Sequence, residues 1–94
     1  MTNEPIEIRD DREAMRYEAS IDGQIALVDY SLKGDTLDLT HTEVPKALEG
    51  RGIGGQLVRF VLDDARARGL TVIPSCSFVA AYIERHPEYR DLLG

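Results

Sequence analysis

The feature that most constrains this chain is its glycine-rich segment, residues 49–55 (EGRGIGG). Before this segment apolar residues alternate with polar ones, and after it they recur every three to four positions. Alternation is typical of half-buried strands, whereas the longer period is typical of an amphipathic helix. The glycines therefore separate a strand-rich half of the chain from its first helix.

The first half predicts an antiparallel meander. Strands are expected at residues 6–9, 15–21, 24–32 and 36–44. Asp22-Gly23 lies between the second and third strands and is a strong two-residue hairpin signal, because glycine tolerates the positive φ that such a turn requires. Lys33-Gly34-Asp35 marks the next turn.

The second half predicts a helix, a strand and a helix. Expected are a helix over 53–68, a capping Gly69, a strand over 70–73, a helix over 77–85 and a last turn around 88–92. The strand–helix–strand succession makes its two strands parallel and the connection right-handed. We therefore predict an α+β fold, with a mostly antiparallel sheet, a β-α-β crossover and a C-terminal helix.

Length and charge exclude several classes of protein. Ninety-four residues suffice for one domain, expected to be 1–94. The net charge is −6, and residues 1–45 hold eleven acidic and four basic side chains, so no basic stripe indicates nucleic-acid binding. No apolar run approaches the ~20 residues of a membrane span, and we expect no membrane partner. The lone Cys76 forms no internal disulfide and fits a cytoplasmic location.

The glycine-rich segment also predicts an anion site. Glycines let the backbone approach a ligand, and the first amides of a helix have no partners within it. Arg51 adds a charge at the same place. Phosphate is favoured over a turn that only packs the helix closely. A nucleoside-triphosphate loop is excluded, because Gln56 and Leu57 stand where it needs Lys and Ser or Thr.

Residues 51–54 (RGIG), between a meander and an amphipathic helix, resemble the acetyl-CoA pyrophosphate loop of GCN5-related N-acetyltransferases. Glu49 departs from that pattern, in which Gln or Arg is usual. Three further segments, 41–45 (HTEVP), 74–78 (PSCSF) and 86–89 (HPEY), resemble a minimal, single-domain branch of the family. The resemblance covers nearly the whole chain.

The resemblance implies acetyl-CoA as the donor, and an amine-bearing small molecule or protein as the acceptor. In the family the two parallel strands splay apart, and the pantetheine arm lies in the gap like an extra strand. The cofactor-binding residues implied for the arm are Thr40, Thr42 and Val44. Those implied for the pyrophosphate are Arg51, Gly52, Ile53, Gly54 and Gly55.

Two residues are candidates for catalysis. Cys76 lies where a strand gives way to a helix, and a helix N-terminus lowers the pKa of a thiol. The alternative is a small buried residue near the thioester. His41 shares strand parity with Leu37 and Leu39, which predicts a side chain on the core side. Its ordinary pKa of about 6.5 suits a base acting on an amine or on Cys76, although such positions often hold a structural histidine. No short ligand spacing predicts a metal site.

The leading hypothesis is an acetyl-CoA-dependent N-acetyltransferase, acting by direct attack of the amine or through Cys76. The alternative is a CoA- or acyl-CoA-binding module with little or no catalysis, because fuller relatives shape the acceptor site with helices for which residues 10–13 leave no room. A third hypothesis is an interaction protein whose loop binds no cofactor. The acceptor and the oligomeric state stay open.

Overall fold

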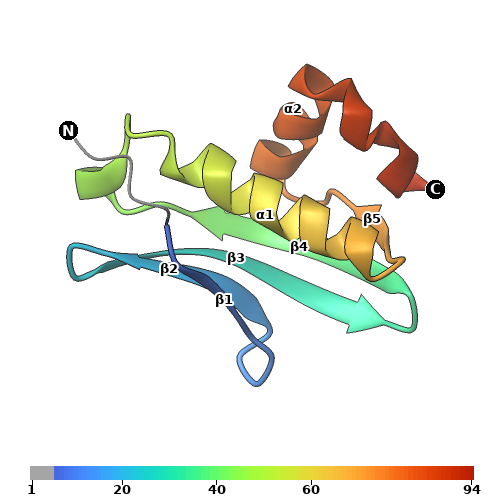
Figure 1. Cartoon of the computed structure of the whole chain (residues 1–94), viewed down its shortest axis with the longest axis horizontal. Helices are drawn as coiled ribbons and strands as arrows, with labels where there is room; N and C mark the ends of the chain where they lie inside the picture. The colour runs from blue at the N-terminus through green and yellow to red at the C-terminus, as the bar shows by residue number, and fades with distance from the viewer. Residues whose placement is uncertain (1–5) are drawn as a thin grey trace.

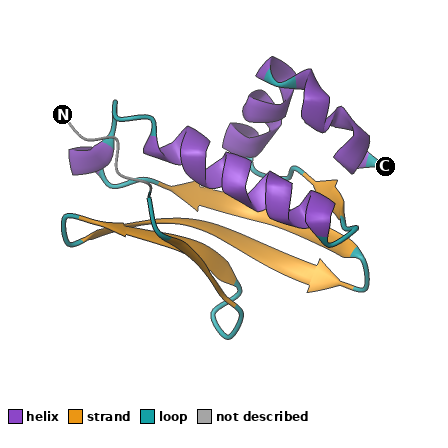
Figure 2. Ribbon diagram, in the orientation of Figure 1, coloured by secondary structure: helices purple, strands orange, loops and turns teal. Residues whose placement is uncertain are grey.

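A computed structural model describes residues 6–94 as a five-stranded sheet with its helices on one face (Figures 1 and 2). The strands are β1 (Ile8–Asp11), β2 (Arg16–Ile21), β3 (Gln24–Lys33), β4 (Thr36–Glu43) and β5 (Thr71–Ile73). The α-helices are α1 (Ile53–Ala67) and α2 (Ser77–Arg85), and the 3-10 helices are η1 (Lys46–Leu48) and η2 (Pro87–Leu93). Neighbouring strands are antiparallel except for β4 and β5, which are parallel. This arrangement confirms the predicted α+β fold.

The β2–β3 hairpin turns at Asp22 and Gly23, as predicted. Their φ angles of 52° and 76° are both positive, the geometry whose twist matches that of the flanking strands. Met15 also has a positive φ, 56°, and lies in the turn before β2. The strand therefore begins at Arg16, one residue later than predicted.

Strand β1 is shifted by two residues from its predicted position at 6–9, because its two aspartates belong to the strand. Asp10 lies opposite Tyr17, and Asp11 lies opposite Arg16. Asp10 also accepts a hydrogen bond of 2.6 Å from the hydroxyl of Tyr30. Distant partners of this kind keep acidic residues in a strand that their own propensity disfavours.

The core lies between the sheet and the two helices. The predicted i+4 series of α1 is buried, and it packs on the inner face of β2, β3 and β4. The largest fully buried side chains are Tyr17, Leu37, Leu39, Leu48, Leu57, Leu62, Val28, Val58, Val61, Val72 and Val79. Full burial of one such aliphatic side chain contributes roughly 1.5–3 kcal/mol. α1 ends at the predicted Gly69 turn, where φ is 70°.

A β-bulge in β4 separates the outer part of this strand from the rest. Tyr30 lies opposite Leu39, but the preceding residue of β3, Asp29, lies opposite His41, so Thr40 is the extra residue. The Thr40 hydroxyl donates to the carbonyl oxygen of Asp29 over 3.3 Å. A bulge reverses the alternation of side chains beyond it. The prediction that His41 points to the core side is therefore wrong: its side chain is 59% exposed on the outer face of the sheet.

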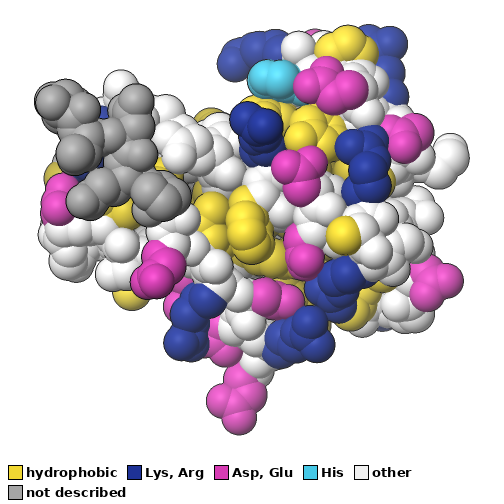
Figure 3. Space-filling view, in the orientation of Figure 1, with side chains coloured by type: hydrophobic (Ala, Val, Ile, Leu, Met, Phe, Trp, Pro, Cys, Tyr) yellow, Lys and Arg dark blue, Asp and Glu magenta, His cyan; other side chains and the backbone are white. Residues whose placement is uncertain are grey.

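The surface carries charges of both signs. On the face that Figure 3 shows, basic and acidic side chains are interspersed, with hydrophobic atoms visible between them. Across residues 6–94, no helix is both long and apolar enough to cross a membrane.

Candidate active site

The glycine segment forms a turn that presents the N-terminus of α1. Gly50 and Gly52 have φ angles of 83° and 73°, and Gly52 caps the helix without a side-chain hydrogen bond. The amides of Ile53, Gly54 and Gly55 occupy the first helical positions, which have no carbonyl of the helix to bond. Together with the positive end of the helix dipole they make a surface that favours phosphate.

Gly54 serves a different purpose from Gly52. A Cβ atom at Gly54 would lie 2.8 Å from Cζ of Phe78 and 3.3 Å from Cγ2 of Val44. A Cβ atom at Gly52 would meet nothing within 4 Å, so the positive φ alone requires glycine there. Gly54 thus lets β4, α1 and α2 approach each other closely.

Arg51 is held beside the loop by the β2–β3 turn. Its Nη1 lies 3.0 Å from Oδ2 of Asp22. The two side chains are 51% and 73% exposed, and an ion pair so exposed to water contributes little stability. The guanidinium is therefore available to a phosphate at the helix N-terminus.

The edge of β4 beyond the bulge has no strand partner on its β5 side. The parallel pairing of β4 with β5 ends at Asp38 and Ile73. The Cys76 amide then donates to the carbonyl of Leu39 over 2.9 Å, after which the chain leaves the sheet and begins α2. Within the described residues, the backbone of 40–44 meets no further strand on this side. An open edge of this kind can accept an extended ligand as an added strand.

The Cys76 thiol lies at the closed end of this edge. Cys76 is the N-cap residue of α2, and its thiol donates to Oγ1 of Thr42 over 3.4 Å. Burial raises the pKa of the Cys76 thiol, but the Thr42 hydroxyl and the amides of Phe78 and Val79 outweigh burial, so the pKa lies below its ordinary value. The arrangement holds a partly buried thiol whose ionisation is favoured by its hydrogen-bond donors.

The structure does not bring His41 to this thiol. Thr42 lies opposite the buried Val28 and faces the helices, as Cys76 does. His41 lies on the other face, where its Nε2 is 3.3 Å from Oε1 of Glu43. The residues predicted for the arm do lie beside the other predicted site residues. Val44 packs near Gly54 of the glycine segment, and Thr42 contacts the Cys76 thiol.

Comparison with known proteins decides the family. A family model described as GCN5-related N-acetyl-transferase matches residues 16–92. The chain belongs to this family. The fold is thus that of a GCN5-related acyltransferase, and the protein is an enzyme of that class.

Relatives share most of their length with this acetyltransferase. Protein NATD1 from Gallus gallus is 31% identical over 86 residues, which span 88% of this chain and 78% of the relative. Protein NATD1 from Homo sapiens is also 31% identical, over 88% and 76% of the two chains. The solution structure of a GCN5-like protein from Staphylococcus aureus superposes with a TM-score of 0.73 at 28% identity, covering 98% and 89%.

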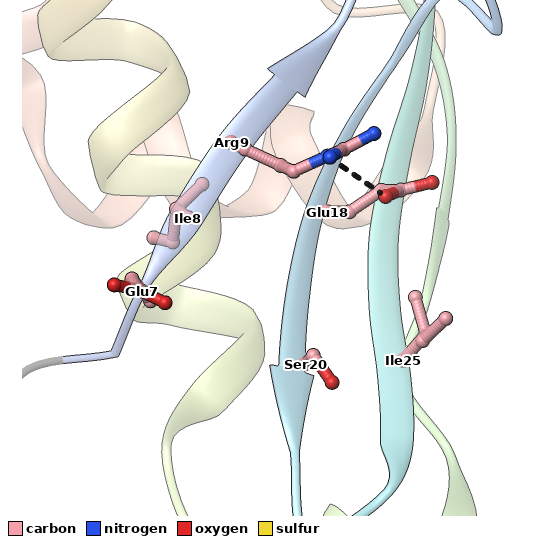
Figure 4. A pocket seen from close by; sticks show the side chains of 6 residues that line it. All are labelled: Glu7, Ile8, Arg9, Glu18, Ser20 and Ile25. Atoms are coloured by element: carbon pink, nitrogen blue, oxygen red, sulfur yellow. Dashed lines mark ion pairs between the residues drawn. The ribbon is translucent and has the colours of Figure 1, made fainter.

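Two surface hollows of the acetyltransferase lie away from these residues. One, of about 170 Å³, opens beside β1 to β3, where Arg9 pairs with Glu18 over 3.5 Å (Figure 4). The other, of about 270 Å³, lies between β1 and α1 and is lined by Phe60 among others. No predicted site residue lines either hollow.

Sequence reasoning missed two contacts around the candidate site. The contact of Thr42 with the Cys76 thiol joins residues 34 positions apart, so no local pattern announces it. The approach of Phe78 to Gly54 joins residues 24 positions apart and is not announced by a local pattern either. Its only signal is a glycine at a helix position that propensity would fill with another residue.

Proposed function

We propose that this protein transfers the acetyl group of acetyl-CoA to a primary amine, with Cys76 as the nucleophile. The observation that carries the proposal is the thiol's environment, a helix N-terminus and the Thr42 hydroxyl that lower its pKa at the end of an open strand edge. A lowered pKa without a ligand channel would mean little. Here the thiol also lies beside the edge of β4 where its pairing with β5 has ended.

The residues present fit CoA. Its phosphates require amide donors and a cation, which the first turn of α1 and Arg51 supply. Its extended arm requires unpaired backbone groups, which residues 40–43 of β4 and the following Val44 would offer towards the β5 side. Acetyl-CoA brings the activated thioester, and a backbone amide at the end of β4 would stabilise the developing oxyanion.

In the proposed route the thiolate of Cys76 forms a bond to the acetyl carbon while the donor's carbon–sulfur bond breaks. The donor leaves as a thiol, taking up a proton equivalent to the one that Cys76 gave up. The amine then takes the acetyl group from Cys76 and loses a proton, and the cysteine thiol is restored. The thiol donates to the Thr42 hydroxyl, and once the thiol has lost its proton this hydrogen bond would reverse, with the Thr42 hydroxyl donating to the thiolate.

Direct attack by the amine is the competing route. It needs a base on the acceptor side, and His41 is placed on the outer face of β4 with an exposed ring. The outer position suits an incoming amine better than it suits the thiol, which lies on the helix side. His41 is therefore assigned to this competing route alone.

The experiment compares wild type, Cys76→Ala and Cys76→Ser with acetyl-CoA and a panel of amines. We expect the rate of Cys76→Ala to fall by at least about a hundredfold, because the variant has no side chain that can accept the acetyl group. Intact mass after incubation with acetyl-CoA alone should show one acetyl group on wild type and none on Cys76→Ala. Full activity in Cys76→Ala would establish direct transfer. CoA stabilisation without turnover across the panel would indicate a binding module.

A further inference from the structure

The ring of Phe78 bridges the two parts of the candidate site. Phe78 lies in the first turn of α2, two residues beyond Cys76. The tip of its ring reaches the first turn of α1, where Cζ would lie 2.8 Å and Cε1 3.4 Å from a Cβ on Gly54. The same point lies 3.3 Å from Cγ2 of Val44, at the end of β4. The ring thus spans the region between the thiol and the glycine loop.

This position is unusual for a large aromatic side chain. Phe78 is 43% exposed, although the neighbouring Gly54 is buried and the following residue, Val79, is fully buried. A phenylalanine half open to water at a closely packed junction leaves apolar surface that a ligand can cover. The absence of a side chain at Gly54 is what gives the ring its place.

We infer that Phe78 forms the apolar wall of the channel for the pantetheine arm, opposite the open edge of β4. The tip of the ring lies against the first turn of α1 and the backbone of Phe78 lies two residues from Cys76, so an arm that joins the α1 N-terminus to the thiol would run along the ring. The ring then holds the arm against the strand edge, so that the thioester carbonyl at the end of the arm reaches the Cys76 thiol. The inference rests on the proposed function and adds a residue that recognises the arm rather than the phosphates.

The test separates the arm from the nucleotide. Calorimetry measures binding of CoA and of phosphoadenosine diphosphate, the nucleotide half of CoA, to wild type, Phe78→Ala and Phe78→Tyr. Phe60→Ala is the matched control, because Phe60 is 41% exposed on α1 and packs against Tyr17 at a ring distance of 6.2 Å. We expect Phe78→Ala to weaken CoA binding by about tenfold. The nucleotide half should bind equally to all four proteins, and Phe78→Tyr should restore CoA affinity to within about twofold of wild type.

Three outcomes would overturn the inference. Unchanged CoA affinity in Phe78→Ala would show that the ring does not contact the arm, and it would leave the proposed function intact. Equal weakening of both ligands would show that the ring acts on the glycine loop and not on the arm. Failure of wild type to bind CoA at all would overturn the proposed function together with this inference.

Discussion

At the scale of single residues, Cys76 shows how backbone and side chain together make a thiol reactive. Its position at the N-cap of α2 exposes it to amides that have no helical partner. Thr42, on a different element, faces it from β4 at 3.4 Å. Neither contribution comes from a charged side chain.

The Cys76 thiol should ionise at lower pH in the folded protein than in the unfolded chain, because its hydrogen-bond donors lower the pKa. The rate of iodoacetamide alkylation at Cys76, followed across pH, should therefore reach half its maximum at a lower pH in the folded protein than in the urea-unfolded protein. Thr42→Val removes the hydroxyl and should shift the midpoint upward. Thr36→Val, elsewhere on β4 and paired with Thr71, is the control and should leave it unchanged. Coincident curves for wild type and Thr42→Val would contradict the role given to this hydroxyl.

The sequence predicts the position of Cys76 at a helix N-terminus correctly, but it predicts the wrong face of the sheet for His41. Pro74 ends a strand and a helical pattern starts at 77, so a helix N-terminus at Cys76 follows from local signals. The face of His41 depends on a bulge at Thr40, which arises from the pairing of β4 with β3. Threonine has no propensity for bulges that a single sequence would reveal, so simple alternation gave the wrong face.

At the scale of elements, the site depends on where α1 begins. The start of this helix, its end near Gly69 and the parallel β4–β5 pair all follow from periodicity and glycine placement. The strand ends were harder to predict, because Asp10 and Asp11 read as turn residues and become strand through partners in β2 and β3. The close approach of α1 and α2 at Gly54 is a tertiary contact that no local pattern encodes.

Replacing Gly52 should test whether the glycine segment binds the phosphates of CoA as well as forming the turn before α1. Gly52→Leu places a side chain in the left-handed conformation, at a cost of about 1–2 kcal/mol, and puts its bulk where the phosphates would lie. We expect it to abolish the thermal stabilisation by CoA, about 2.7 kcal/mol at 100 times the dissociation constant.

The control for this variant is Gly34→Leu, in the β3–β4 turn, where φ is 58° and no atom lies within 4 Å of a Cβ. It carries a similar backbone strain at a site away from the loop. Gly34→Leu should lose comparable stability and keep the full response to CoA. A full CoA response in Gly52→Leu would count against phosphate binding at α1.

At the scale of the whole molecule, tyrosine hydroxyls join its layers. Tyr17 of β2 donates to Asp64 of α1 over 2.7 Å, and Tyr89 of η2 donates to Asp63 of α1 over 2.7 Å. The third pair joins β3 to β1, where the hydroxyl of Tyr30 donates to a carboxylate over 2.6 Å. Each hydroxyl must keep its proton to donate, so the packing of helix and sheet is linked to tyrosine ionisation.

The protein should therefore lose stability at alkaline pH. Burial, followed by the carboxylate that each hydroxyl bonds, raises the pKa of Tyr30 and of Tyr89 to about 12, and raises the pKa of Tyr17 further. Because these values lie above the unfolded value near 10, the stabilisation is complete below pH ~10 and is lost as pH rises through the folded pKa. Urea midpoints measured between neutral pH and pH ~12 should fall mainly above ~10.

Tyr30→Phe is the matched variant for this dependence. It removes the ionisable group, so its alkaline loss of stability should be smaller than that of wild type, although its stability at neutral pH falls with the lost hydrogen bond by about 1 kcal/mol. Parallel curves for the two proteins would show that Tyr30 ionisation does not contribute.

The strands lie in the sheet in the same order as in the chain, and this order has a consequence for synthesis on the ribosome. Each of β2, β3 and β4 pairs with the strand made just before it, so the meander needs only short loop closures to form. Its inner face, however, stays bare until α1 emerges to cover Tyr17, Val28 and Leu39. A nascent chain halted at the glycine segment would carry an uncovered apolar sheet, and it would be at this stage of its synthesis that the protein most needs a chaperone.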